Sequence, residues 1–315
     1  MSNASTSSPA PIRIGIDLGG TKIEAIVLDP SGDCLHRRRV ASPRGDYEAT
    51  VRAVAGLVTD VEHELGRRGN VGVGIPGTLS RATGLVKNAN STWLNGRPLD
   101  RDLAAALGRP VRLQNDANCF AMSEAADGAA AGARVVFGVI LGTGVGAGIV
   151  VDGRPLDGPN GIAGEWGHNP LPWPDAEELP GPPCYCGLSG CIETFLSGPG
   201  LAAGFRQETG RQLTAVELAG AATAGDATAG RHLERYAGRL ARGLAHVINI
   251  LDPDVIVLGG GLSNLAMLYD RVPALWGRHA FTDRVDTRLL PPRHGDSSGV
   301  RGAAWLWRPD DVPPP

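Results

Sequence analysis

A strand, a glycine turn and a second strand are predicted twice in this chain, at residues 12–28 and 135–151. The first turn reads Leu-Gly-Gly-Thr-Lys22, and the second reads Gly142-Thr-Gly-Val-Gly146. Short apolar runs on both sides of a glycine turn are typical of paired strands. The two copies share a pattern rather than a sequence, so they indicate a second domain of related design and not a sequence repeat.

Strand and helix patterns alternate over most of the remaining chain. Apolar residues recur at helical spacing over 49–67, and a strand is expected at 71–75. A short helix at 100–107, a strand at 111–114 and a helix that starts near Cys119 follow. Such alternation predicts an α/β fold with a mixed or parallel sheet, in which ligands bind where strands end.

The second half of the chain is mostly helical before a last strand. Residues 198–251 have a helical pattern, a strand at 255–258 ends in three glycines, and a final helix is expected to start at 294–299. These patterns divide the chain into three parts. They are a disordered segment at 1–11, a small α/β lobe at 12–117 joined by a C-terminal helix at 297–308, and a large α/β lobe at 118–296 with a loop at 164–193.

Composition limits the classes of function. The 315 residues suit two moderate domains, and 42% hydrophobic with 20% charged residues supports a buried core. A net charge of −3 gives no basic field for nucleic acid. Residues 135–151 are uncharged, but glycines interrupt them and they are too short to span a bilayer, so no membrane partner is expected. Five cysteines, an odd number, indicate a reducing, cytoplasmic location rather than a disulfide framework.

Three of the five cysteines lie within eight residues, at Cys184, Cys186 and Cys191. The glycines between them allow a backbone turn sharp enough for three sulfurs to face one point. His168, sixteen residues upstream of Cys184, could supply a fourth ligand, and Cys3His is a common tetrahedral zinc set. The alternative is a group of ordinary buried cysteines, which are not expected to cluster in this way. Such a zinc ion would be structural, because four protein ligands leave no open position.

Both glycine turns, and a third glycine run at 259–261, could hold phosphate oxygens through backbone N–H groups and a threonine hydroxyl. Neither turn is a Walker P-loop, since no Gly-Lys-Ser/Thr opens a helix, and each turn alone could be a simple hairpin. Together they predict one nucleotide site between two lobes. Asp17 lies just before the first turn and is well placed to hold a hydrated Mg²⁺.

Asp116 is the predicted catalytic residue. It follows the strand at 111–114 and precedes a helix that Asn118 could cap. An acid at this place can take a proton from a sugar hydroxyl as that hydroxyl attacks the γ-phosphate, and phosphoryl transfer often uses a carboxylate to orient the nucleophile. The alternative is that Asp116 only helps to cap the helix.

Polar residues on neighbouring loops resemble a pocket for a polyol, because amides and carboxylates pair with hydroxyls that both donate and accept. These residues are Asn90, Asn115, Glu165, His168 and Glu193. His168 could bind zinc through one ring nitrogen and donate from the other to a sugar hydroxyl. Cys34 and Cys119 are isolated in the sequence, and both are expected to be packing residues.

Five motifs together resemble the ROK family, which is named for repressors, open reading frames and sugar kinases. The motifs are Asp17-Leu-Gly-Gly-Thr-Lys22, Asn115-Asp-Ala-Asn118, Gly142-Thr-Gly144, Gly164-Glu-Trp-Gly-His168 and Cys184-Tyr-Cys-Gly-Leu-Ser-Gly-Cys-Ile-Glu193. The resemblance spans roughly residues 12–307. Within the family, the chain looks closest to bacterial fructokinases of the manno(fructo)kinase type, on the runs at 86–96, 166–173 and 294–307.

The resemblance implies an actin-like ATPase (ribonuclease H-like) fold with two α/β lobes and a central cleft. It also implies ATP and Mg²⁺ as cofactors, transfer of the γ-phosphate to the 6-hydroxyl of a hexose, and commonly a homodimer. By position, Asp116 is the base, and the zinc ligands are His168, Cys184, Cys186 and Cys191. The sugar contacts are Gly77, Asn90, Asn115, Glu165, His168 and Glu193. The nucleotide contacts are Asp17, Gly19, Gly20, Thr21, Lys22, Gly142, Thr143, Gly144, Gly260 and Gly261.

The identity of the sugar depends on the resemblance alone. We expect D-fructose, with mannose as a second substrate. A glucokinase or N-acetylhexosamine kinase is the alternative, because pockets discriminate poorly between hydroxyl epimers unless a polar partner is left unpaired. Trp166 stands where many hexokinase-type relatives have a smaller or aliphatic residue, and it could tune the sugar. A sugar-responsive repressor is disfavoured, because the eleven or so residues before the first strand lack a helix-turn-helix pattern.

Overall fold

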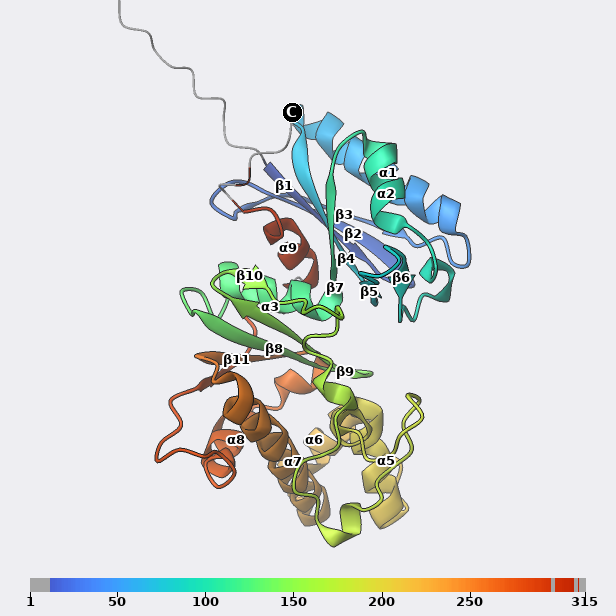
Figure 1. The fold of residues 1–315 in the computed structure, drawn as a ribbon. Helices are drawn as coiled ribbons and strands as arrows, with labels where there is room; N and C mark the ends of the chain where they lie inside the picture. The colour runs from blue at the N-terminus through green and yellow to red at the C-terminus, as the bar shows by residue number, and fades with distance from the viewer. Residues whose placement is uncertain (1–11, 296–297, 309–310, 312–315) are drawn as a thin grey trace, which may run out of the picture. The chain divides into compact units, whose positions relative to one another are not determined.

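The structure is a computed structural model, and it describes residues 12–295, 298–308 and 311. The segment expected to be disordered, 1–11, lies outside the described residues, as does residue 297 at the expected start of the last helix. The chain divides into two compact units (Figure 1). The first unit runs to Cys119 and includes residues 159–161 and the chain from Gly299 on; the second comprises Phe120–Gly158 and Ile162–Ser298.

The sheet of the first unit has five strands in the order β3-β2-β1-β4-β7. Antiparallel pairing joins β1 to β2 and β2 to β3, whereas β1, β4 and β7 run parallel and present their carboxyl ends at one edge. The strands are β1 (Ile12–Leu18), β2 (Lys22–Leu28), β3 (Cys34–Ala41), β4 (Gly69–Ile75) and β7 (Val111–Asn115). Two short strands, β5 (Thr78–Leu79) and β6 (Val86–Lys87), form a separate hairpin, and η1 (Thr92–Leu94) follows it.

Helices cover both faces of this first sheet (Figure 1). α1 (Tyr47–Leu65) and α2 (Leu99–Leu107) share a buried core with one face, while α9 (Ser298–Trp305) packs against the other. A Cβ on Gly15 of β1 would lie 2.0 Å from the carbonyl oxygen of Val300. Glycine at this position is therefore what allows α9 to approach the strand so closely.

Local capping decides where α1 begins and ends. The Asp46 side chain accepts a hydrogen bond from the Ala49 N–H at 2.9 Å, and Gly66 ends the helix with a φ of 61°. Both are favoured capping residues, the first for its carboxylate and the second for its tolerance of the left-handed region. The helix expected at 49–67 is confirmed, with both ends two residues earlier.

The sheet of the second unit has the order β10-β9-β8-β11-β12, with the same directions as the first sheet. β8, β9 and β10 pair antiparallel, and β8, β11 and β12 run parallel. The strands are β8 (Val135–Leu141), β9 (Val145–Val151), β10 (Arg154–Pro155), β11 (Val255–Gly259) and β12 (Arg288–Leu290). The related design that the two glycine turns indicated is therefore present in the sheet topology.

The larger core of the second unit lies between its sheet and a group of helices. α3 (Asp116–Ala126) passes from the first unit into the second, where a Cβ on Gly259 of β11 would lie 2.6 Å from the ring of Phe120. The remaining helices are η2 (Trp166–His168), η3 (Ala176–Glu178), α4 (Ile192–Leu196), α5 (Gly198–Thr209), α6 (Ala215–Thr223), α7 (Ala227–Leu251), η4 (Gly261–Asn264) and α8 (Leu268–Trp276). Among the described residues, no helix has both the length and the apolar composition needed to cross a bilayer.

Two local expectations are wrong. The helix expected near Cys119 begins at Asp116, directly after β7, so Asn118 lies inside it and cannot cap it; its amide donates to Gln114 Oε1 at 3.1 Å instead. Cys34 is exposed on an edge strand rather than packed, whereas Cys119 is fully buried as expected. β7 extends to Asn115, so the helix after it begins earlier than expected. β3 is an edge strand with many exposed residues, so Cys34 is exposed with it.

Candidate active site and metal centre

Asp116 and Asp17 follow two parallel strands that are separated only by β4. Asp17 pairs in register with Gly74 of β4, and the next β4 residue pairs with Asn115, which precedes Asp116. Strands two apart are about 10 Å from one another. The first unit therefore presents two carboxylates along one edge of its sheet, where ligands bind in α/β folds.

Gly74 and Cys119 occupy the space between these two acids. A Cβ on Gly74 would lie 3.2 Å from Cys119 Sγ, so the thiol sits against the strand. Burial, followed by the charges of Asp116 and Asp17, raises the pKa of Cys119 well above its usual value. The thiol therefore stays protonated, and it serves as packing rather than as a nucleophile.

Asn115 links the end of β7 to Gly77, another residue of the expected sugar site. Its side-chain amide donates to the Gly77 carbonyl at 3.1 Å, and its Oδ1 accepts from the Ala117 N–H at 2.9 Å. Asp116 Oδ1 also accepts from Ala117 N, at 2.8 Å. Asn115, which precedes α3, therefore accepts the hydrogen bond typical of a helix cap, whereas Asp116 lies inside the helix. Asn90, the other amide expected here, is exposed.

Burial raises the pKa of Asp17, and the negative charge of Glu24 adds to this effect, whereas Lys22 and Arg39 oppose it. Asp17 and Glu24 face each other across β1 and β2. A carboxylate held next to another in a buried place gains from a cation, which suits the Mg²⁺ that a nucleotide brings.

The first glycine turn is held as a tight hairpin. Gly19 N–H donates to the Lys22 carbonyl at 3.0 Å, and a Cβ on Gly20 would lie 3.2 Å from Ser91 Oγ. Ser91 is buried, and its hydroxyl has no hydrogen-bond partner among the described residues. Sequence reasoning missed Ser91. The buried hydroxyl beside a glycine turn is a group that a phosphate oxygen would satisfy.

The second glycine turn contacts Gly260 within the second unit. Gly142 N–H donates to Gly144 O at 3.0 Å, and Gly260, with a φ of 77°, lies against the end of β8, where a Cβ would be 2.4 Å from Leu141 O. The structure thus brings together two of the segments that were predicted separately for the nucleotide.

Glu193 has a role that sequence reasoning did not foresee. Its Oε2 accepts a hydrogen bond from Val145 N–H at 2.8 Å, and a Cβ on Gly144 would lie 2.6 Å from the same oxygen. Glu193 follows Cys191 by two residues and lies in the first turn of α4 (Ile192–Leu196). The carboxylate therefore ties the cysteine loop to the second glycine turn.

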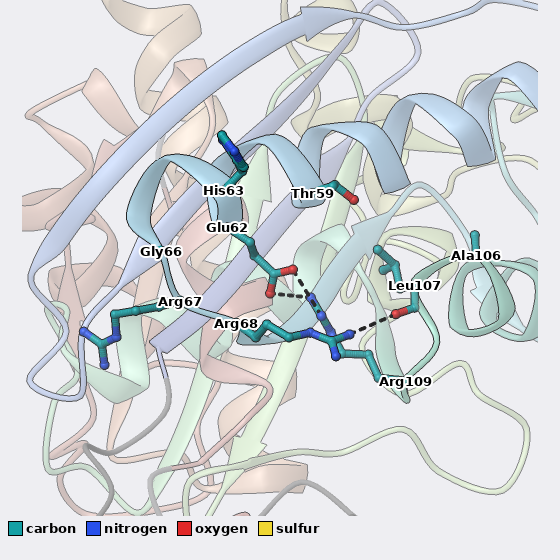
Figure 2. Close-up of a pocket in the computed structure, with 9 residues that line it drawn as sticks. All are labelled: Thr59, Glu62, His63, Gly66, Arg67, Arg68, Ala106, Leu107 and Arg109. Atoms are coloured by element: carbon teal, nitrogen blue, oxygen red, sulfur yellow. Dashed lines mark hydrogen bonds and ion pairs between the residues drawn. The ribbon is translucent and has the colours of Figure 1, made fainter.

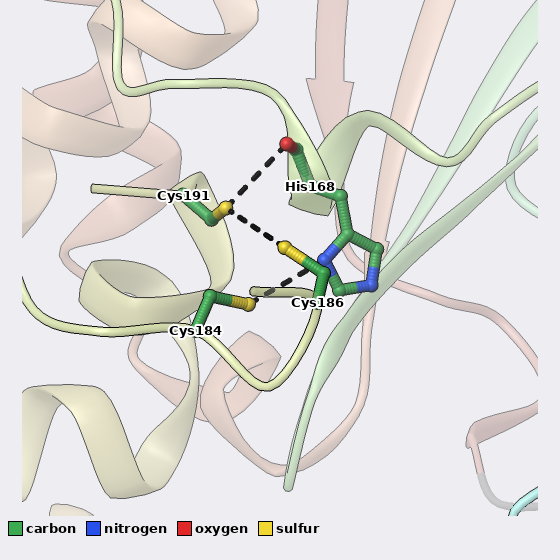
Figure 3. Close-up of side chains that lie close together, drawn as sticks. All are labelled: His168, Cys184, Cys186 and Cys191. Atoms are coloured by element: carbon green, nitrogen blue, oxygen red, sulfur yellow. Dashed lines mark hydrogen bonds between the residues drawn. The ribbon is translucent and has the colours of Figure 1, made fainter. Parts of the chain in front are cut away.

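The three cysteines and His168 converge as predicted (Figure 3). Cys184 Sγ lies 3.6 Å from His168 Nδ1, Cys186 Sγ lies 3.6 Å from Cys191 Sγ, and the four ligand atoms all lie within 4.8 Å of one another. Ligands about 2.3 Å from a tetrahedral ion are about 3.8 Å apart. The donor set and its spacing therefore fit zinc.

The thiols of this cluster do not share one pKa. A backbone hydrogen bond from Leu188 contributes most to lowering the pKa of Cys186 to about 7, whereas burial first, and then hydrogen bonds with Cys186 and Cys184, raise the pKa of Cys191 to about 12. Crowded thiols oppose each other's ionisation unless a cation lies between them.

Tyr185 stands between two cysteine ligands, and sequence reasoning overlooked it. Its hydroxyl lies 3.0 Å from His168 Nε2, and the two rings meet edge to face with centroids 5.1 Å apart. The nitrogen expected to reach a sugar hydroxyl therefore already faces a phenol. Tyr185 is 84% exposed, so this contact can be exchanged for another. Its place between two cysteines in the Cys-Tyr-Cys run was the available signal in the sequence.

Trp166 is a core residue. Only 5% of it is exposed, and its ring packs edge to face on Phe137 with centroids 5.7 Å apart. The nearby Gly164 has a φ of 94°, which turns the chain so that Trp166 points inward while Glu165 stays exposed. The expectation that Trp166 tunes the sugar stays a prediction, and its buried indole N–H has no hydrogen-bond partner among the described residues.

The predicted site residues fall on both units. The first unit holds Asp17, Gly19, Gly20, Thr21, Lys22, Gly77, Asn90, Asn115 and Asp116. The second holds Gly142, Thr143, Gly144, Glu165, His168, Cys184, Cys186, Cys191, Glu193, Gly260 and Gly261. Asp17, Asn115 and the two glycine turns lie at strand ends, whereas the cysteines lie on a loop.

Comparisons with known proteins agree with these motifs. The sequence model of the ROK family matches residues 13–310. The chain is 41% identical over 296 residues to the N-acetyl-D-glucosamine kinase of Photobacterium profundum, covering 93% of this chain and 98% of that protein. The crystal structure of a ROK hexokinase from Thermus thermophilus matches with a TM-score of 0.82 and 35% identity, over 94% of this chain and 97% of the other.

A second solved structure is similar over the same length. The ROK family glucokinase from Streptomyces griseus, in complex with glucose and AMPPNP, has a TM-score of 0.72 and 28% identity, over 94% of this chain and 98% of the other. The two-lobed, actin-like α/β fold implied by the motifs is confirmed. With the family's sequence model covering nearly the whole chain, the protein belongs to the ROK family.

Proposed function

We propose that N-acetyl-D-glucosamine is the substrate of this ROK family sugar kinase, which transfers the γ-phosphate of ATP to the sugar's 6-hydroxyl. The observation that carries this proposal is the 41% identity, over nearly the full length of both chains, to an N-acetyl-D-glucosamine kinase. The expectation of fructose, with mannose second, is not confirmed. The similarity favours the alternative, an N-acetylhexosamine kinase, instead.

Asp116 is the proposed general base. Its carboxylate sits at the carboxyl end of β7, and the hydrogen bonds from Ala117 N–H to Asp116 and Asn115 fix the first turn of α3 around it. As the 6-hydroxyl attacks in line, its proton passes to the Asp116 carboxylate. Bound Mg²⁺ would neutralise charge on the phosphates, and Asp17 is the residue of this chain suited to face it.

The proposed sugar contacts come from both units. In the first unit, Asn115 and Gly77 are already joined by a hydrogen bond. In the second unit, Glu165 and His168 lie at the two ends of η2 (Trp166–His168), and Glu193 is fixed by the second glycine turn. Carboxylates, amides and an imidazole can each pair with hydroxyls of a hexosamine.

The role proposed for zinc is to hold these second-unit residues in place. The four ligands His168, Cys184, Cys186 and Cys191 connect η2 to the loop that precedes α4. Four protein ligands leave no coordination position for substrate, so the ion would supply structure and no chemistry. The nearby residues of the chain contact the sugar.

Glucose is the second candidate, because the Streptomyces griseus relative binds glucose and is similar over 94% of this chain. A coupled assay with ATP should compare N-acetylglucosamine, N-acetylmannosamine, glucose, fructose and mannose by kcat/KM. We expect N-acetylglucosamine to be highest. A higher kcat/KM for glucose or fructose would overturn the proposed substrate. If a sugar binds but none is phosphorylated, the proposal that the protein is a kinase would be overturned. Light scattering would test the homodimer, which stays a prediction.

A further inference from the structure

A cavity of about 420 Å³ lies in the second unit, and the proposed kinase reaction uses none of its residues. The arginines and aromatic residues that line it are Trp173, Arg235, Arg239, Arg242, Arg278 and His279. They come from the segment before η3, from α7 (Ala227–Leu251), and from the chain that follows α8. The volume falls within the usual range for small-molecule sites.

Ion pairs account for only part of the arginine charge. Glu178 accepts from Arg239 Nε at 2.7 Å and from Arg242 Nη2 at 2.7 and 2.8 Å, and a backbone N–H donates to it as well, so its oxygens are occupied. Arg235 pairs with Glu208 from the edge of the cavity. In the described part of the chain, no acid pairs with the exposed guanidinium of Arg278. Asp175, which also lines the cavity, lies 3.4 Å from Arg242 Nη1. The four arginines outnumber the three acids Asp175, Glu178 and Glu208, so the cavity retains positive charge.

Trp173 offers a flat apolar surface next to this charge. The residue has a φ of 46°, although it is neither glycine nor asparagine, and 51% of it is exposed. Its ring stacks on His279 with centroids 5.0 Å apart, and Arg242 Nη1 donates to its carbonyl at 2.8 Å. A bulky residue in the left-handed region costs about 1–2 kcal/mol. A chain keeps such strain where the position of the side chain matters.

His279 does not add a positive charge to the cavity at neutral pH. Burial, followed by the charges of Arg242 and Arg278, lowers the pKa of its imidazole. The neutral ring can therefore stack with Trp173 without repelling the arginines. The cavity combines a neutral aromatic wall with a cationic one, and this combination suits an anion carried on a ring.

We propose that this cavity binds a phosphate monoester attached to a small ring, with the phosphate at Arg278 and the ring against Trp173. A sugar phosphate and a nucleoside monophosphate share this chemistry. The site goes beyond the proposed kinase reaction and does not depend on it, because none of its residues is among the proposed base, sugar, nucleotide or zinc contacts.

A second cavity, of about 410 Å³, shows why arginines alone do not carry the same inference (Figure 2). Arg109 donates to both oxygens of Glu62, and Arg68 donates to the Leu107 carbonyl at 3.3 Å. No tryptophan, tyrosine or phenylalanine lines this cavity among the described residues. Two of its arginines are directed to partners within the protein, and it has no large apolar ring, so it lacks the two features that favour a ligand.

Calorimetry with three probes tests the proposal. N-acetylglucosamine 6-phosphate, AMP and inorganic phosphate are titrated into the full chain and into Arg278→Ala, Trp173→Gly and Arg271→Ala. Arg271 is the matched control, because it is an exposed arginine on α8 that pairs with Glu234 and does not line the cavity. Arg278→Ala should weaken binding of at least one ring-bearing probe about tenfold or more, since a charge-assisted contact is lost. Trp173→Gly should weaken the same probe, and Arg271→Ala should leave it unchanged.

The ring-bearing probe whose affinity falls in Arg278→Ala shows whether the ligand is a sugar phosphate or a nucleoside monophosphate. Equal affinity for inorganic phosphate would show that the ring is not recognised, and this would overturn the proposal. Binding that is unaffected by Arg278→Ala would also overturn it, because any remaining site must then lie elsewhere. Light scattering on the same variants covers one more outcome. A change in mass would assign the cavity to contact between copies of the chain and reject a small-molecule site.

Discussion

The two sheets have the same strand order and directions, yet they carry different chemical groups at equivalent positions. In the first sheet, Asp17 faces Glu24 across the hairpin. At the equivalent place in the second sheet, Ile140 faces Gly146. One scaffold therefore presents acids in one copy and only apolar or small groups in the other, which shows that a fold supplies positions and single residues supply chemistry.

The segments that leave the two sheets differ in the same way. β7 of the first sheet ends at Asn115 and passes directly into α3 with Asp116 at its start, whereas β12 of the second ends at Leu290 and a proline follows. In the second unit, the chain between β10 and α4 forms the loop that carries the cysteines. The first copy thus holds the proposed base, and the second holds the proposed metal.

Replacing the acid that only the first unit carries should have the largest effect. Asp116→Asn keeps the shape of the side chain but removes the base, so kcat should fall by about a hundred- to ten-thousand-fold. Sugar binding, measured by calorimetry, should stay within about tenfold. Asp152→Asn changes an exposed acid that directly follows β9 of the second sheet, and it should leave turnover unchanged. Substantial residual activity in Asp116→Asn would remove this residue from the base role.

Removing a metal ligand should affect the second unit alone. Cys184→Ser should lose zinc, loosen the loop that holds His168 and Glu193, and lower sugar affinity indirectly. Elemental analysis gives the metal content. Cys34→Ser, which changes an exposed cysteine of the first sheet, is the control and should keep the metal. Normal zinc in Cys184→Ser would refute the ligand set.

The buried acid of β2 should contribute stability that depends on pH. Burial opposes the charge of Glu24, but hydrogen bonds from Arg39 and Arg37 outweigh it and lower its pKa below the usual value of 4.5. Because the folded pKa is depressed, the stabilisation is complete above about pH 4.5 and is lost as the pH falls through the folded pKa. Glu24→Gln should therefore lower the free energy of unfolding by about 2 kcal/mol at pH 7.

Denaturant titrations at pH 7 and at acidic pH would measure this difference, which should shrink on acidification. Glu64→Gln is a matched control, because Glu64 forms an exposed pair with Arg38 of β3. Exposed pairs contribute about 0–1 kcal/mol, so a small effect is expected. If Glu24→Gln lowers the free energy of unfolding equally at both pH values, the shape of the side chain and not its charge accounts for the loss.

The smallest effect is expected at Tyr185. Its hydroxyl faces His168 Nε2, and a single N–H donates well to only one acceptor at a time. Tyr185→Phe removes this competitor, so KM for the sugar should fall about threefold with kcat and zinc content unchanged, as one exposed hydrogen bond is released. A rise in KM would instead make the phenol a direct sugar contact.

Local spacing was enough for the parts of the site that depend on neighbours in the chain. The cysteine cluster, the two glycine turns and Asp116 at the end of a strand all lie where the sequence predicts, because a few bonds of backbone separate the groups concerned. The apolar face of α7 was equally clear, since Leu233, Tyr236 and Leu240 recur at helical spacing and are buried. These features follow from the spacing of apolar residues within one element and from the residues of a local turn.

Contacts between distant segments were decided only by the tertiary structure. Glu193 accepts from the second glycine turn across 48 residues, and Trp166 is buried against Phe137. Neither pairing has a local signal, because burial depends on which elements pack together. Local patterns also could not predict the identity of the sugar, because epimers differ by single hydrogen bonds to a pocket. The sequence by itself determined the strands, the glycine turns and the close spacing of the three cysteines; packing decided which of the remaining polar and aromatic side chains are buried and which stay exposed.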